Sequence, residues 1–249
     1  MRTSRAGMIF LATVLLAVAG CASGTSAAGP TPEPRMAIVQ ALQSTAKLHA
    51  VHALLRIELR EADGRQFLAT FEGDVDIAAR ELDVTAAFVP GVFGTERARA
   101  VLVDGFLFYR SDGSWSTSGG PGSDPLAGVP ATAEVAAAVE DAIRNPATSI
   151  TLAGTEACGD ATCLRVRAEV PAQVAWHAMV AMLQAAGQPQ GSAPSMPNRF
   201  PGVAIDFWIE PGTLRLRQAT NTTMIDGHSV SIVLSRHDVP VAIRAPVQR

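Results

Sequence analysis

The sequence predicts an α+β protein in which a long antiparallel sheet is combined with about three helices. Two long regions alternate apolar and polar residues with a period of two, which is typical of strands with one buried face. Three other segments lack this alternation and are compatible with helices. With 48% apolar and 17% charged residues in 249, the chain has the composition of a globular protein.

The first helix is predicted over residues 36–50. Apolar residues recur there at three-and-four spacing, at Ile38, Val39, Leu42 and Ala46. One face of this helix is therefore expected to pack inward.

Sheet structure is predicted to dominate residues 52–118. Apolar and polar residues alternate most clearly in the expected strands 53–59, 66–77 and 82–88, and a hairpin is expected in 101–109. Turns are expected at Asp63-Gly64, Pro90-Gly91 and Asp112-Gly113. Consecutive strands joined by short turns are expected to pair antiparallel.

The second half contains two more helices and the remaining strands. The alanine-rich segment 131–144 predicts a helix that ends at Asn145-Pro146, and a third helix is predicted from Pro171 to Ala186. Strands are expected at 149–154, 163–170, 203–209, 214–222 and 230–234, and the proline-rich segment 187–202 is predicted to be a loop.

The N-terminus resembles a bacterial lipoprotein signal. Arg2 and Arg5 precede the apolar run 8–19, which is too short to span a bilayer as a stable helix. The run ends in Val-Ala-Gly-Cys, which looks like a lipobox, so residues 1–20 are predicted to be a signal peptide. Cys21 would become the acylated first residue, carrying fatty acids such as palmitate. The alternative is a buried free cysteine.

Residues 21–35 are predicted to be the lipidated cysteine and a flexible tether. They are mostly small, polar or proline, so little apolar surface would offset the entropy of ordering. The chain is therefore expected at the cell membrane, lipid-anchored on the extracytoplasmic face, with residues 36–249 forming one domain.

Two further cysteines, Cys158 and Cys163, flank a Gly-Asp turn between strand-like segments. Outside the cytosol, a disulfide across a hairpin is the expected pairing. A redox pair would need two intervening residues rather than four, and a zinc site would need further ligands.

Several function classes are not indicated. The net charge is −3 and the arginines are interspersed with acids, so neither nucleic acid nor an anionic membrane surface is expected as an electrostatic partner. Ser44 to Lys47 matches a serine acyl-enzyme motif, but Lys47 is the only lysine, so the accompanying lysine motif is missing. His49 and His52 lack a clear third metal ligand. We therefore expect no enzyme activity, no catalytic residue, no metal and no cofactor.

Five segments together resemble the LppX/LprG lipoproteins of mycobacteria. They are the lipobox with its tether, VDGFLFYRSDGSW, LAGTEACGDATCLRV, VAIDFWIEPGTLRLRQ and SRHDVPVAIRAP. The likeness extends over most of residues 36–246, and the order of the segments carries it more than any single motif.

The resemblance implies a LolA-like fold, in which a curved antiparallel half-barrel is closed by helices around an apolar cavity for acyl chains. The implied function is to carry a lipid or glycolipid between the membrane and the cell envelope. A membrane transporter is expected as a further partner, nucleic acid is not, and the protein is expected to be a monomer. Strand alternation nominates the cavity lining, although each position could equally belong to an ordinary core: Leu55, Ile57, Leu59, Phe67, Phe71, Val84, Phe88, Phe106, Phe108, Val166, Ile205 and Phe207. The alternative function is a non-catalytic sensor or scaffold lipoprotein with a filled interior that docks a membrane partner.

Overall fold

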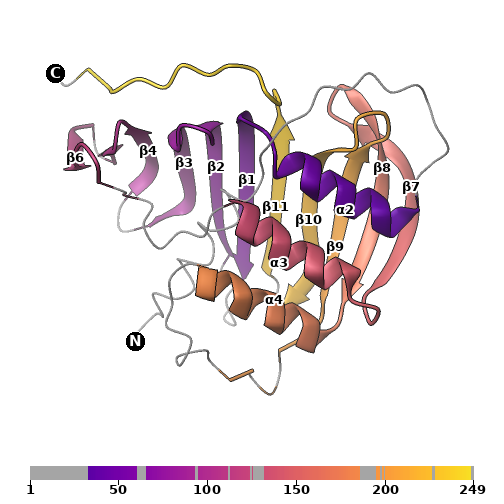
Figure 1. The fold of residues 1–249 in the computed structure, drawn as a ribbon. Coiled ribbons are helices and arrows are strands. Elements are labelled where there is room, and N and C mark those ends of the chain that lie inside the picture. Colours follow the sequence, from indigo (N-terminus) through magenta and orange to yellow (C-terminus); the bar gives the residue numbers. More distant parts are fainter. Residues whose placement is uncertain are drawn as a thin grey trace. The chain divides into compact units, whose positions relative to one another are not determined.

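The α+β prediction is confirmed by a computed structural model (Figure 1). The structure describes residues 33–60, 66–92, 95–111, 113–123, 125, 132–185, 195–196, 198, 200–225 and 228–247. Within these residues, three helices accompany an open antiparallel sheet with the strand order β6-β5-β4-β3-β2-β1-β11-β10-β9-β8-β7. The chain divides into two compact units, residues 1–47 with 127–217 and residues 48–126 with 218–249. The expected signal peptide, Cys21 and most of the tether lie outside the described residues.

The first unit combines the three helices with three strands. Its elements are α2 (Pro34–Thr45), α3 (Thr132–Arg144), β7 (Ser149–Cys158), β8 (Ala161–Val170), α4 (Ala172–Ala185) and β9 (Val203–Glu210). α2 packs on β7 and β9, α3 packs on β8, and α4 packs on α3 (Figure 1). The buried side chains of α2, among them Ile38 and Val39, fall on the face that the sequence periodicity predicted.

Arg35 joins α2 to the C-terminal end of α3. Its guanidinium donates to the backbone oxygens of Ile143, Asn145 (3.1 Å) and Thr148 (2.8 Å). Carbonyls at a helix C-terminus have no partner within the helix, so a side-chain donor satisfies them. Glu33 caps the other end of α2 by accepting from the backbone N–H groups of Arg35 and Met36.

The second unit is built from strands. It contains β1 (Ala50–Arg60), β2 (Gln66–Asp76), β3 (Glu81–Val92), β4 (Thr95–Val103), β5 (Phe106–Arg110), β6 (Trp115–Gly119) and β11 (His228–Ser235), and β10 (Arg215–Ile225) runs from the first unit into the second. β1 to β6 form an antiparallel meander, and β11 pairs with the free edge of β1. Pairing of β1 with the last strand could not be predicted from local alternation.

Gly73 marks a close approach between β2 and β3. It pairs with Val84, and a Cβ at this position would lie 2.7 Å from the Val84 Cα and 2.9 Å from the Asp83 carbonyl carbon. Only a residue without a side chain permits this separation of the two backbones.

Three sequence predictions about element boundaries were wrong. Pro90-Gly91, expected to be the turn after strand 82–88, lies within β3, which continues to Val92. The first helix ends at Thr45 rather than at residue 50, because Ala50 already belongs to β1 and pairs with Asp76. β4 begins at Thr95, in a segment where arginine and alanine alternate and few large apolar residues indicate a strand. The predicted Asp63-Gly64 turn lies outside the described residues. Among the helices that the structure describes, none has the length and apolar character needed to cross a membrane.

Candidate functional site

Seven of the twelve nominated residues share one face of the second unit's sheet. Directly opposite residues in an antiparallel pair project to the same face. Leu55 is opposite Phe71, which is opposite Ala86, so β1, β2 and β3 are in a common register. The nominated residues on this apolar face are Leu55, Ile57, Leu59, Phe67, Phe71, Val84 and Phe88.

Burial on the apolar face decreases from β1 towards β3. Leu55 and Ile57 are completely buried, whereas Phe67, Phe71 and Phe88 are only half-buried. These three phenylalanines form an aromatic cluster, with ring centroids 6.3 Å apart for Phe67 and Phe88 and 5.9 Å apart for Phe71 and Phe88. Large apolar groups of β2 and β3 are therefore partly open to solvent, on the same face as the buried Leu55 and Ile57 of β1.

Small residues surround the aromatic cluster. Ala69 is opposite Phe88, Ala86 is opposite both Phe71 and Ala98, and Ala100 is opposite Val84. Ala69 and Ala86 are buried, so the apolar area that remains exposed beside them belongs to the half-buried phenylalanine rings.

Phe106 and Phe108 lie on the opposite face of the same sheet. Phe108 is opposite Val101, whose own partner Asp83 is opposite Asp74 on the polar side of β2. The two phenylalanines pack with Val101 and Val103, and Ile243 of the C-terminal segment packs against this group. The register therefore does not bring them together with the aromatic cluster.

The remaining nominated residues, Val166, Ile205 and Phe207, belong to the first unit. Val166 is opposite Phe207, and Ile205 is two positions along β9, so all three project to one face. Val166 and Phe207 are buried, while Ile205 is half-buried.

α4 carries an apolar face that is not fully covered. Gln173, His177 and Gln184 are its polar residues, and all three are exposed. Among its apolar residues only Trp176 is buried, in edge contact with Phe200 at 5.1 Å between ring centroids. The other large apolar side chains, Val174, Met179, Val180, Met182 and Leu183, are half-buried. The sequence analysis did not predict this exposed apolar face, although the absence of charged residues from the helix could have indicated it.

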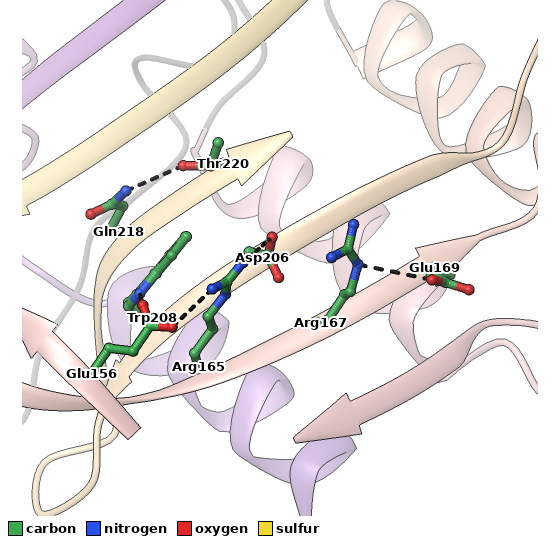
Figure 2. Close-up of polar contacts among 8 residues, drawn as sticks. All are labelled: Glu156, Arg165, Arg167, Glu169, Asp206, Trp208, Gln218 and Thr220. Atoms are coloured by element: carbon green, nitrogen blue, oxygen red, sulfur yellow. Dashed lines mark hydrogen bonds and ion pairs between the residues drawn. The ribbon is translucent and has the colours of Figure 1, made fainter. Parts of the chain in front are cut away.

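A polar cluster lies across β7, β8 and β9, as Figure 2 shows. Arg165 donates to Glu156 Oε1 at 2.8 Å and to Asp206 Oδ2 at 3.1 Å, and its guanidinium stacks on Trp208. The Trp208 Nε1–H donates to Glu156 at 3.1 Å. The side chains that form these bonds alternate with the apolar residues along β8 and β9, so the polar cluster and the apolar residues project to opposite faces of the strands.

The charges in the polar cluster stabilise one another. Hydrogen bonds from Arg165 and Trp208 lower the pKa of Glu156, and the hydrogen bond to Asp206 raises the pKa of Arg165. Asp206 is completely buried, and its Oδ1 has no hydrogen-bond partner among the described residues. The cluster is a cross-strand ion-pair network, and it contains no nucleophile with an adjacent base.

The predicted disulfide between Cys158 and Cys163 is present and closes the β7–β8 hairpin. Within the described part of the chain, no three residues of the types His, Cys, Asp and Glu are grouped to hold a metal ion.

Comparison with known proteins identifies the fold. The lipoprotein LppX of Mycobacterium tuberculosis aligns over 84% of this chain and 97% of its own, with 15% identity and a TM-score of 0.53. LprF from Mycobacterium bovis aligns over 90% of this chain and 99% of its own, with 16% identity and a TM-score of 0.56. No protein-family model matches the sequence, and no curated protein matches it. The chain therefore has the LppX- and LprF-like fold that its motif order predicted.

Proposed function

We propose that this protein is a membrane-anchored, exported lipoprotein that binds the acyl chains of a lipid or glycolipid and carries it between the membrane and the cell envelope. The observation that carries the proposal is the half-buried aromatic cluster on the apolar sheet face, in a fold shared with the lipoprotein LppX. The lipobox-like sequence ending at Cys21 supplies the anchor.

The aromatic cluster fits an acyl chain as its ligand. Phe67, Phe71 and Phe88 offer ring surface and edges, and the small residues Ala86 and Ala69 lie opposite Phe71 and Phe88. Glu72, Asp74 and Asp83 project to the other face, and Glu96 at the start of β4 is the acid whose side chain projects to the apolar face. A flexible hydrocarbon chain gains most from such a surface, because each buried methylene contributes about 0.8 kcal/mol.

That increment is sufficient for stable binding. A sixteen-carbon chain would gain about 10 kcal/mol before the costs of ordering it, so no charged group is required to hold it. We therefore infer a non-covalent carrier, in which the lipid enters and leaves without chemistry on the protein.

The test is lipid extraction. A Cys21→Ser variant lacks the acyl group of the anchor, so any lipid that organic solvent releases from the purified protein was bound by its folded body. Mass spectrometry of the extract is expected to find acyl lipid in stoichiometric amount. A ligand-free protein would contradict the proposal and favour the scaffold alternative.

A matched pair of substitutions locates the ligand. Phe67 and Leu68 are adjacent and both half-buried, but they project to opposite faces of β2. We expect Phe67→Ser to weaken binding of a fluorescent fatty acid several-fold, and Leu68→Ser to leave it unchanged. Equal effects of both substitutions would exclude the apolar face as the binding surface.

A further inference from the structure

The polar face of the second unit carries a group of basic residues that the linear sequence conceals. Arg97 and Arg99 lie two positions apart on β4, and Arg110 on β5 is directly opposite Arg99. Trp115 on β6 is directly opposite Arg110. We call these four residues the basic cluster; the three arginines are exposed and Trp115 is half-buried.

Trp115 holds two of the arginines. The Arg110 guanidinium lies 5.1 Å from the centre of the Trp115 ring, and that of Arg99 lies 6.0 Å from it. Two like charges directly opposite each other normally destabilise a sheet. The face of the indole ring attracts both cations and offsets part of this repulsion.

Nearby acids neutralise little of the basic cluster. Arg99 donates to both carboxylate oxygens of Asp83, at 2.8 and 2.5 Å. Arg97 and Arg110 have no ion pair with any acid among the described residues. Glu96 precedes Arg97 in the sequence, but its side chain projects to the other face, because alternate residues of a strand face opposite sides.

Three other acids on the polar face have basic partners: Asp74 is bonded to His52 and to Arg236, Glu58 is paired with Arg56, and Glu72 lies 3.5 Å from His52 Nε2. Asp76 and Glu81 instead accept the backbone N–H groups of Ala79 and Asp104. The basic cluster is therefore a local excess of positive charge on a protein whose net charge is −3.

We propose that the basic cluster docks on an anionic phospholipid bilayer. Arginine pairs with lipid phosphates through its planar donors, and tryptophan is favoured at the water–bilayer boundary. The acyl anchor of the proposed function, on which this inference rests, keeps the cluster near the bilayer and makes a weak contact effective. Docking would give the folded body a defined orientation on its tether.

The experiment reconstitutes the acylated full chain into vesicles of phosphatidylcholine, with or without phosphatidylglycerol. Energy transfer from tryptophan to a dansyl group on lipid headgroups reports how closely the protein approaches the bilayer. We expect transfer to increase in anionic vesicles and to decrease again at high salt. The Trp115→Phe variant is expected to lose the increase, because Trp176 and Trp208 lie on other elements.

Substitution of the arginines tests the electrostatic part. Each arginine near an anionic leaflet is expected to change the docked fraction about 5-fold, so Arg97→Gln/Arg110→Gln should lower the ratio of docked to undocked protein about 25-fold. The control Arg80→Gln/Arg144→Gln removes the same charge from exposed positions outside the cluster and should retain docking.

Equal transfer in neutral and anionic vesicles would overturn the proposal, and so would an equal loss in the control. The anchor is assessed separately by flotation of the chain with neutral vesicles. If the chain does not float with neutral vesicles, the anchor is refuted. The basic cluster must then be sufficient, without the anchor, to recruit the protein to anionic vesicles. Absence of that recruitment would also overturn the inference.

Discussion

Gly73→Ala is expected to destabilise the sheet at the junction of β2 and β3. The new methyl carbon would lie 2.7 Å from the Val84 Cα and still closer to the Asp83 carbonyl oxygen. Ordinary contact begins at about 3.4 Å, so the β3 backbone would have to move by at least about 0.7 Å at Val84.

The displacement sets the magnitude. Forcing an extra methyl group into a packed site costs about 1–3 kcal/mol, and replacing a strand glycine restores about 0.4–1 kcal/mol by restricting the unfolded chain. With both terms at mid-range, we expect a net loss of about 1.3 kcal/mol. For a chain of this size, the loss corresponds to a melting temperature lower by about 3–5 °C.

Thermal unfolding followed by circular dichroism measures this loss. Gly212→Ala is the matched control, because no atom lies within 4 Å of the Cβ it would add. It is expected to leave the melting temperature unchanged or slightly higher. If Gly73→Ala and Gly212→Ala have the same melting temperature, the close approach of β2 and β3 does not constrain the residue at position 73 and the reasoning is wrong.

Three further predictions concern the polar cluster and the disulfide. Folding lowers the pKa of Glu156, so the stabilising effect of its carboxylate is complete above its ordinary pKa of 4.5 and is lost as the pH falls through the folded-state pKa. The melting temperatures of the parent protein and of Glu156→Gln should therefore converge in acid. A constant difference between them from pH 7 to about pH 3 would contradict this. Asp206→Ala removes a buried acceptor from Arg165 and should cost about 1–3 kcal/mol in urea unfolding, whereas an unchanged midpoint would show that the bond is dispensable. The Cys158–Cys163 disulfide closes only a short loop, so its reduction should cost about 2 kcal/mol or less of stability, and a fully unfolded reduced protein would contradict this.

Local pattern was sufficient for most elements of the fold. Alternation located the strands around Leu55, Phe71 and Val166, and the Gly-Asp turn between Cys158 and Cys163 indicated the hairpin that the disulfide closes. Pattern failed where neighbouring residues gave no contrast. β4 starts in an arginine–alanine repeat, and the first helix stops early because the chain beyond it is used in strand pairing.

The candidate site depended on register, which a sequence does not contain. Phe106 and Phe88 look alike in their own strands, because each is followed by another apolar residue, Leu107 or Val89. Only the chain of opposite pairs from β1 to β5 shows that they lie on different faces. A shift of one residue in any pairing would exchange the two faces, so alternation within a strand cannot assign a shared surface.

Charge shows the same division between sequence and structure. By itself the sequence determined the composition, the lipobox-like segment, the spacing of the cysteines and the period of each strand. Arginines and acids are interspersed along the sequence, and this pattern predicts no basic surface. The tertiary structure decided which charges are neighbours: β4 projects Glu96 and Arg97 to opposite faces, and cross-strand pairing brings Arg110 beside Arg99. Distance in space governs electrostatic and apolar contacts, and in a sheet that distance is set by register.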